Sequence, residues 1–292
     1  MVGLLEVAFL VVVWLWVGCA ALFLRSTVLP RLPIHLRPES LGLPSETVRF
    51  VATDGRELEG WKIPATPQAP WVVMCHGLGS NRSDLLDIGA ALHHAGVNLF
   101  LFDFRGHGGS RGHVTSFGWK EQRDLEGALA CLGAQSEVPA RPYGVYGISM
   151  GGAVAAMVAS RDERIGAVAV DSIYTDLHET LARHLMLLYR LPRVPFSWCM
   201  AVTYRLRFGI WPRHVSPREA LNRLGRRPCL VIHGAEDVRV PVVGVQEMVA
   251  ASATGTELWM VPGAGHLEAL GKVPGEYVER LGLFFKRSLS WS

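Results

Sequence analysis

Three residue types in this sequence together suit nucleophilic acyl transfer: a serine, a carboxylate and a histidine. Ser149 lies in Gly147-Ile148-Ser149-Met150-Gly151, which fits the pattern G-x-S-x-G, and the small-residue run GGAVAAMVAS follows it. Between a strand and a helix, this pattern holds a serine on a sharp bend with its hydroxyl exposed. Glycines flank the serine because the two backbones approach too closely for side chains. We therefore predict that Ser149 is a nucleophile; the alternative is a Gly-Ser turn that only packs a helix onto a sheet.

A serine hydroxyl attacks well only when a base removes its proton in the transition state. Among the eleven histidines, His266 is the best placed, because the loop PGAGH brings it just past the last predicted strand. Asp237, which follows an earlier strand in HGAED, is predicted to orient the imidazole and to stabilise the imidazolium. The adjacent Glu236 and the more distant Asp171 remain as alternative carboxylates.

The negative charge that develops on the substrate oxygen needs hydrogen-bond donors. One predicted donor is the backbone N–H of Met150, because it opens the helix after the nucleophile, where amides lack partners. The second is the N–H of Leu78, in the loop HGLGSN after the third strand. His76 in this loop is expected to brace the backbone rather than to act as a base. Arg105 and Asp103, in DFRGHGGS, are likewise expected to be structural.

Short runs rich in β-branched and aromatic residues predict the strands that position these side chains. The first two form a hairpin through Asp54-Gly55. Most later runs are continuously apolar, which is typical of parallel strands covered on both faces. The predicted strands are 47–53, 58–64, 71–75, 97–103, 143–148, 167–171, 229–233 and 257–261.

Helical patterns fill the gaps between these strands, at 83–95, 120–133, 150–160, 244–251 and 276–287. The alternation predicts an α/β fold, with a mostly parallel eight-stranded sheet and helices on both faces. One stretch is longer than a simple crossover needs, between the strand that ends at Asp171 and the one that begins at Cys229. We predict a helical insertion at about 175–211 over the carboxyl edge of the sheet, followed by a crossover helix near 217–224.

Residues 7–24 form an uncharged apolar run, eighteen residues long. As a helix it would span roughly 27 Å, close to the ~30 Å hydrocarbon core of a bilayer. A retained anchor competes with a cleaved signal peptide and with a lipoprotein signal that ends at Cys19. No basic side chain precedes the run, the run continues past Cys19, and Trp16 makes a poor lipobox. We therefore predict a transmembrane anchor within residues 1–25.

Basic residues follow the apolar run and none precedes it: Arg25, Arg31 and Arg37. The positive-inside rule then favours a cytoplasmic globular domain on a single-pass anchor. Four prolines in residues 26–45 predict an extended, stiff tether. The globular domain is predicted to cover residues 46–292.

Composition excludes several classes of protein. The formal charge is +3, and no aromatic-interleaved basic stripe supports nucleic-acid binding. Five scattered cysteines, without CxxC or metal-ligand spacing, predict neither a disulfide framework nor a metal site, and favour a reducing compartment. Residues 177–227 hold ten arginines and two acids among many aromatic residues. This segment is either a face that lies on an anionic membrane or an ordinary cap with solvated arginines.

The motifs HGLGSN, DFRGHGGS, GISMGG, HGAEDVRVP and GAGH resemble, in order and spacing, those of the α/β-hydrolase superfamily. The sequence is most similar to membrane-anchored abhydrolase-domain proteins, monoacylglycerol-lipase-like enzymes and serine aminopeptidase-like hydrolases. The resemblance covers residues 46–292. It implies a triad of Ser149, Asp237 and His266, an acyl-enzyme intermediate, no cofactor, and a lid formed by the insertion.

From the resemblance we expect a serine hydrolase for carboxylic esters, with a small-molecule acyl ester or a lipid as substrate. A thioesterase, an amidase or peptidase, and an acyltransferase would use the same residues. A catalytically silent binding protein on the same fold is the alternative of another class. The sequence leaves the physiological substrate and the oligomeric state open.

Overall fold

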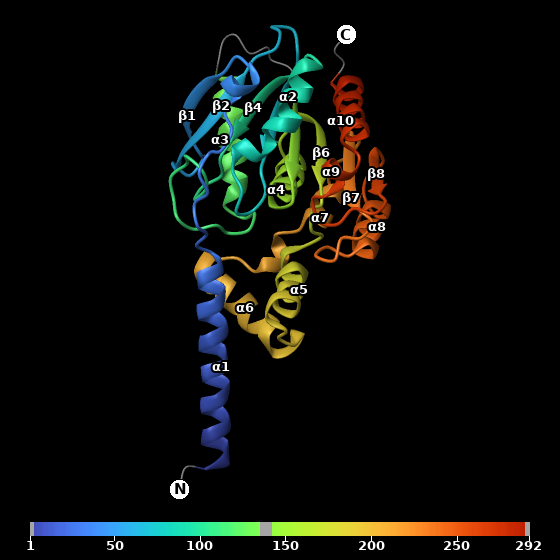
Figure 1. Ribbon diagram of the computed structural model, residues 1–292. Coiled ribbons are helices and arrows are strands. Elements are labelled where there is room, and N and C mark those ends of the chain that lie inside the picture. Colours follow the sequence, from blue (N-terminus) through green and yellow to red (C-terminus); the bar gives the residue numbers. More distant parts are fainter. Residues whose placement is uncertain (1–2, 135–141, 290–292) are drawn as a thin grey trace.

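The computed structural model describes residues 3–134 and 142–289, so the ends of the predicted segments 1–25 and 46–292 lie partly outside it. Its centre is an eight-stranded sheet in the order β1-β2-β4-β3-β5-β6-β7-β8 (Figure 1). Antiparallel pairing is confined to β2, which pairs with β1 and β4; the remaining neighbours are parallel. This sheet confirms the predicted fold class. The strands are β1 (Glu46–Val51), β2 (Glu57–Ile63), β3 (Trp71–Cys75), β4 (Asn98–Phe102), β5 (Tyr143–Ile148), β6 (Ile165–Asp171), β7 (Cys229–Gly234) and β8 (Thr256–Val261).

Helices cover both faces of the sheet, each over its own hydrophobic core. On one face lie α3 (Glu121–Gly133), α4 (Met150–Ala159), α7 (Pro217–Asn222) and α8 (Val242–Ala250). On the other lie α2 (Leu86–His94), α9 (Ala269–Lys272) and α10 (Pro274–Ser288). Short 3-10 helices occur at Pro38–Leu41, Arg82–Leu85 and Pro212–His214. Every residue of α4 is buried, because this helix packs between the sheet and its neighbours.

The helix α1 (Leu4–Ser26) projects from one end of the molecule (Figure 1). Among the helices of the described residues, α1 is the one whose length and apolar composition would allow it to cross a membrane. Its carboxyl-terminal part packs on the protein: Cys19 and Phe23 are buried, and the Phe23 ring contacts the rings of Phe117 and Tyr204. The end of α1 is thus part of the folded core.

The chain that follows α1 is extended and runs along the globular domain. The Arg31 guanidinium donates to the carbonyl oxygens of Gly108, Ser110 and Gly112 at 2.6–2.9 Å. The Asn81 amide donates to the carbonyl oxygen of Pro33 at 3.1 Å. Residues 26–45 are therefore docked on the domain along their length, whereas the sequence indicated only a stiff tether.

The long connection between β6 and β7 begins with the helices α5 (Leu177–Tyr189) and α6 (Arg193–Phe208), and α7 follows them before β7. The helices α5 and α6 pack against each other, and α6 packs against α1. In Figure 1 the pair lies on the side of the sheet from which α1 projects. Large apolar side chains on this pair are exposed, including Leu188 (66%), Val194 (70%), Trp198 (67%) and Leu206 (72%). We call this pair the cap.

Candidate active site

Ser149 lies on a strained bend between β5 and α4. Its φ of 48° and ψ of −117° are unusual for a residue with a side chain. The bend is held because the Ser149 N–H donates to the carbonyl oxygen of Asp171 at 2.8 Å. Glycine is required on both sides: a Cβ on Gly147 would lie 2.5 Å from the carbonyl oxygen of Gly151, and a Cβ on Gly151 would lie 2.2 Å from that of Cys75. The bend presents the serine hydroxyl at the carboxyl edge of the sheet.

The structure brings the three predicted side chains into one hydrogen-bonded chain. His266 Nε2 lies 3.2 Å from Ser149 Oγ, and His266 Nδ1 lies 2.7 Å from Asp237 Oδ2. The other carboxylate oxygen of Asp237 accepts the backbone N–H groups of Arg239 and Val240, at 2.8 and 2.9 Å. Burial acts to raise the pKa of Asp237, but these hydrogen bonds, that with His266 foremost, hold it below its ordinary value. Asp237 is therefore ionised and fixes Nδ1 of His266 as the protonated nitrogen.

The two alternative carboxylates do not contact His266. Glu236 is exposed to solvent on the same loop as Asp237. Asp171 is buried, and its oxygens accept hydrogen bonds from the hydroxyls of Ser172 (2.8 Å) and Tyr277 (2.7 Å). The backbone carbonyl of Asp171 thus holds the bend at Ser149, and its carboxylate holds Ser172 and Tyr277.

The loop after β3 directs the backbone N–H of Leu78. His76 Nε2 accepts the N–H of Phe104 at 3.0 Å, so Nδ1 carries the proton and donates to the carbonyl oxygen of Gly77 at 2.7 Å. Because a trans peptide is planar, the N–H of Leu78 points the opposite way from this carbonyl, away from the His76 ring. Burial, followed by the proximity of His107, keeps the pKa of His76 well below its ordinary value, so the ring is neutral.

This loop lies directly beside Ser149. A Cβ on Gly77 would lie 3.7 Å from the Cβ of Ser149. In the described part of the chain, neither the Leu78 N–H nor the Met150 N–H donates to a backbone carbonyl. Both residues line the cavity above Ser149. The two amides predicted to receive the oxyanion are therefore unpartnered and adjacent to the serine.

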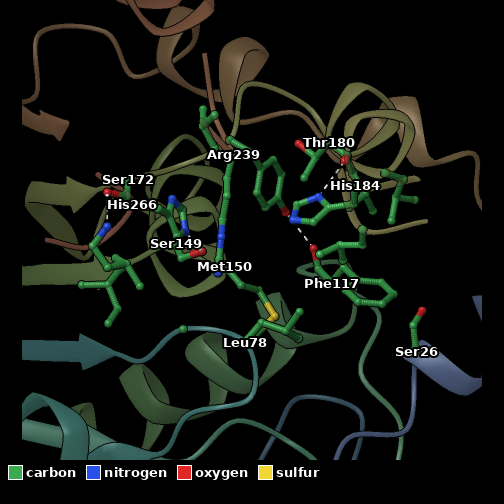
Figure 2. A pocket seen from close by; sticks show the side chains of 18 of the residues that line it. Ser26, Leu78, Phe117, Ser149, Met150, Ser172, Thr180, His184, Arg239 and His266 are labelled. Carbon is green, nitrogen blue, oxygen red and sulfur yellow. Dashed lines mark hydrogen bonds between the residues drawn. The ribbon is translucent and has the colours of Figure 1, made fainter. Parts of the chain in front are cut away.

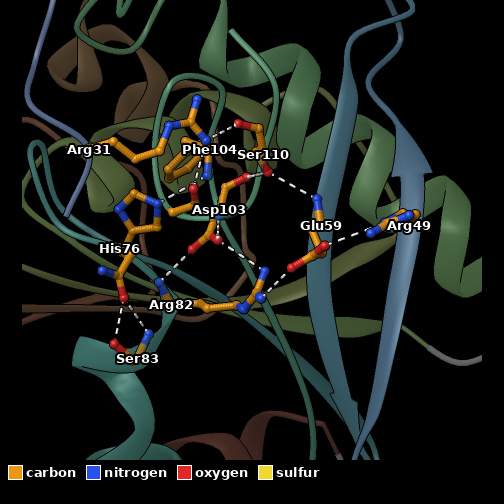
Figure 3. A network of polar contacts seen from close by, with 12 residues as sticks. Arg31, Arg49, Glu59, His76, Arg82, Ser83, Asp103, Phe104 and Ser110 are labelled. Carbon is orange, nitrogen blue, oxygen red and sulfur yellow. Dashed lines mark hydrogen bonds and ion pairs between the residues drawn. The ribbon is translucent and has the colours of Figure 1, made fainter. Parts of the chain in front are cut away.

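A network of buried ion pairs fixes the loop that follows β3 (Figure 3). The Arg82 guanidinium donates to Asp103 at 3.0 Å and to Glu59 at 2.6 Å. Asp103 also accepts the backbone N–H groups of Arg82 and Gly109, both at 2.7 Å. It thereby ties the loop at 76–82 to the glycine turn at 103–110. Arg105 makes a separate structural ion pair, with Asp54 and Asp124.

A cavity of about 500 Å³ opens above Ser149 (Figure 2), which we call the apolar cavity. Its volume lies within the ~300–1,000 Å³ typical of small-molecule sites. Most of its wall comes from apolar side chains of the sheet edge and of the cap. These include Phe117, Ile148, Tyr174, Leu177, Leu181, Leu185, Leu188 and Met200. Such a wall suits the hydrocarbon chain of an acyl group.

Several residues of the site escape prediction from motifs. Ser26, the last residue of α1, and Leu29, just after it, line the apolar cavity, although no motif in the sequence marks them. Ser172 accepts the N–H of Leu267 at 3.1 Å and so helps to hold the His266 loop. His184 lines the cavity from α5, where burial lowers its pKa and favours the neutral ring. His184 had a detectable signal, because it is a polar residue on the apolar face of an amphipathic helix.

No group of three or more His, Cys, Asp or Glu side chains suited to a metal ion occurs among residues 3–134 and 142–289.

Known proteins are similar to this chain in sequence and in fold. A family model described as serine aminopeptidase, S33, matches residues 66–198. An esterase of Pyrococcus furiosus superposes with a TM-score of 0.75 and 28% identity, covering 90% of this chain and 100% of the esterase. The chain belongs to the α/β-hydrolase superfamily. Membership in this superfamily, with esterases among its structural neighbours, supports hydrolase activity.

Relatives in the superfamily include proteins without a described activity. An uncharacterized protein of Mycobacterium tuberculosis is 32% identical over 217 residues, which are 73% of this chain and 69% of that protein. An uncharacterized membrane protein of Saccharomyces cerevisiae is 30% identical over 125 residues, or 42% of this chain and 43% of that protein. Neither name states a substrate.

Proposed function

We propose that this α/β-hydrolase is a membrane-associated serine hydrolase that cleaves carboxylic esters with lipid-like acyl groups through an acyl-enzyme intermediate. One observation carries the proposal: the chain Ser149 Oγ–His266 Nε2–Asp237 Oδ2, with distances of 3.2 and 2.7 Å. These distances allow a proton to leave the serine as its oxygen attacks.

The reaction follows from this geometry in two halves. Ser149 Oγ attacks the ester carbonyl while His266 Nε2 takes its proton, and the amides of Leu78 and Met150 bind the oxyanion. His266 then gives that proton to the departing alcohol oxygen as the C–O bond breaks, which leaves an acyl-serine. A water molecule, deprotonated by His266, attacks the acyl-serine. The product is a carboxylic acid, and the serine hydroxyl is regenerated.

Labelling by a fluorophosphonate probe tests the nucleophile. We expect the folded full-length chain to be labelled, and Ser149→Ala to be unlabelled with an unchanged melting temperature. Ser26→Ala is the matched control, because Ser26 lines the same cavity while its hydroxyl donates to the carbonyl oxygen of Phe23, outside the proposed triad. If the wild-type chain is folded but unlabelled, the hydrolase proposal is contradicted and a catalytically silent binding protein is favoured.

Substrate profiling tests the reaction class. The apolar wall of the cavity favours acyl esters of p-nitrophenol with chains longer than acetate. Esters from acetate to palmitate, with the matching thioesters and amides, should separate an esterase from a thioesterase, an amidase or an acyltransferase. The favoured result is the highest kcat/KM on an ester of intermediate or long chain; a preference for amides would favour a peptidase.

The membrane part of the proposal rests on α1 and on the cap beside it. The window Phe9–Ser26 is apolar enough to span a bilayer, and burial of Cys19 and Phe23 against the protein favours a retained helix over a cleaved signal. The cap, which carries several exposed apolar side chains, packs through α6 against α1 (Figure 1). We infer that the cap contacts the bilayer surface, so that a lipid-like ester enters the cavity there.

Orientation follows from the arginines after α1, which favour a cytoplasmic catalytic domain. Membrane fractions washed with alkaline carbonate should retain the intact chain. Protease added to sealed cells or spheroplasts should leave the domain uncut, and should digest it after the membrane is permeabilised. Release by carbonate, or digestion without permeabilisation, would contradict this part of the proposal.

A further inference from the structure

A second cavity, of about 330 Å³, adjoins the apolar cavity. The two share Thr180, Arg239 and Val240 in their linings. The second lining contains four guanidinium groups and two carboxylates, so it is electropositive, and we call it the basic cavity. These charged residues are Arg183, Arg193, Arg218, Arg239, Asp176 and Glu179.

Both carboxylates of the basic cavity are already engaged. Asp176 caps α5 by accepting the N–H of Glu179 at 2.9 Å, and Glu179 pairs with Arg193. The Arg239 guanidinium, by contrast, makes no hydrogen bond or ion pair within the described residues. Its backbone N–H holds Asp237, but its side chain is free for a ligand.

The Arg239 side chain lines the apolar cavity together with His266, the residue proposed to protonate the departing alcohol oxygen. His266 Nε2 delivers the proton to the departing oxygen, and Arg239 follows Asp237, the partner of His266, on the same loop. In Figure 2 the Arg239 side chain extends into the cavity between His266 and His184. The acidic side chain that lines the apolar cavity, Asp84, comes instead from the Leu78 side, where it accepts from Ser80.

An unpaired guanidinium in this position discriminates between substrates. A neutral alcohol group would displace water from Arg239 without replacing its hydrogen bonds, which disfavours binding. A phosphate or carboxylate on the alcohol would accept a bidentate pair from the planar guanidinium. The neighbouring Arg183 and Arg218 would add favourable long-range charge.

We propose, building on the ester hydrolysis proposed above, that Arg239 and the basic cavity bind an anionic group on the alcohol side of the substrate. The acyl chain occupies the apolar cavity, and the anion, a phosphate or a carboxylate, lies against Arg239. The substrate class is therefore an acyl ester of an anionic alcohol, such as an acylated glycerol phosphate or an acylated hydroxy acid.

Matched substrates test this specificity with the full-length chain in detergent micelles. The phosphate pair is monooctanoylglycerol phosphate and monooctanoylglycerol; the carboxylate pair is O-octanoyl-lactate and its methyl ester. We expect kcat/KM for the anionic member to exceed that for the neutral one by about tenfold or more in at least one pair. The pair that shows the preference identifies the anion.

Variants assign the preference to Arg239. Arg239→Gln should reduce the anionic-to-neutral ratio towards one, Arg239→Lys should retain part of it, and the exposed cap control Arg205→Gln should keep it. A wild-type ratio near one in both pairs, or a ratio that survives Arg239→Gln, overturns the proposal. Failure to hydrolyse any ester, p-nitrophenyl esters included, would instead contradict the proposed function.

A binding measurement separates the anion site from catalysis. Octyl phosphate and octyl carboxylate should raise the melting temperature of the wild-type chain more than octanol does, and Arg239→Gln should abolish the difference. Equal shifts for octanol and for both anions in the wild type would refute the anion site even if esters are cleaved.

Discussion

The Nδ1 atom of His76 lies 2.7 Å from the carbonyl oxygen of Gly77, and this contact sets the direction of the next peptide N–H. His76→Ala frees that peptide to rotate, so the Leu78 amide would no longer be held in the direction proposed for binding the oxyanion. We expect kcat to fall about 10- to 100-fold with little change in KM, because the amide acts mainly in the transition state. Initial rates on a p-nitrophenyl ester measure this, with the exposed His94→Ala as control. An unchanged kcat in a folded variant would remove His76 from this role.

Two adjacent acids provide a direct test of which carboxylate orients His266. Asp237→Asn should lower kcat by about 10³- to 10⁴-fold, because an amide can select the wrong imidazole tautomer and does not stabilise the imidazolium. Glu236→Gln removes a charge one residue away and should stay within about twofold, since its side chain is exposed. The reverse ranking would assign the role to Glu236.

Tyr277 stabilises the fold through the buried carboxylate of Asp171. Tyr277→Phe leaves one oxygen of this carboxylate without its 2.7 Å donor, and we expect the free energy of unfolding to fall by about 2 kcal/mol. Tyr146→Phe is the matched control, because it removes the 2.8 Å hydroxyl contact with Tyr277 but leaves that donor in place. Urea denaturation followed by circular dichroism measures both; an equal loss in the two variants would contradict the assignment.

Acid should weaken the ion pair between Asp54 and Arg105. The hydrogen bonds from Arg105 keep the pKa of Asp54 below its ordinary value of 3.8. A lowered carboxyl pKa stabilises the fold above the ordinary value, and this contribution is lost as the pH falls through the folded-state pKa. Asp54→Asn should therefore cost up to about 1 kcal/mol at neutral pH, since the pair is partly exposed.

The difference between Asp54→Asn and wild type should narrow as the pH falls below the ordinary pKa of 3.8 towards the folded-state pKa. Melting temperatures between about pH 7 and pH 3 measure it. The exposed Asp87→Asn is the control and should show no such dependence. A difference that grows as the pH falls would show that the sign of the Asp54 pKa shift is wrong.

The cap should matter for esters in membranes rather than for esters in solution. Val194 and Trp198 are exposed apolar residues on α6 and do not line the apolar cavity. Replacing both by serine should lower hydrolysis of a palmitoyl ester in anionic vesicles several-fold, while that of p-nitrophenyl acetate stays unchanged. Leu283→Ser, on α10 at the far end of the molecule, is the control (Figure 1). Equal activity of all variants on vesicles would exclude the cap from membrane contact.

The sequence predicts the sheet well, because apolar runs of five to seven residues between turns leave few alternatives. The strands Trp71–Cys75 and Tyr143–Ile148 coincide with their predicted ranges. Helix ends are less certain: the predicted helix at 83–95 begins as a 3-10 turn, since the Asn81 side chain caps Ser83 N. The last helix starts at Pro274, a residue type favoured in the first turn of a helix.

The proposed triad could be placed from sequence because each of its members follows a strand in a glycine-containing loop. The walls of the cavity could not be predicted in this way. Ser26 and Leu29 lie more than a hundred residues from Ser149 in sequence, and their place in the cavity depends on how α1 packs against α6. The free side chain of Arg239 likewise depends on which nearby acids are already paired. Such contacts depend on tertiary packing, and tertiary packing produces no hydrophobic periodicity that could be recognised in one amino-acid sequence.

Because Ser26 and Leu29 line the apolar cavity, the amino-terminal segment would belong to the proposed substrate site as well as to the proposed anchor. Under that proposal, proteolytic release of the domain by a cut after Leu29 would alter substrate selectivity at the same time as it solubilises the protein. A recombinant protein that lacks this segment would have a wider, more hydrated apolar cavity. Its substrate preferences would therefore differ from those of the full-length chain.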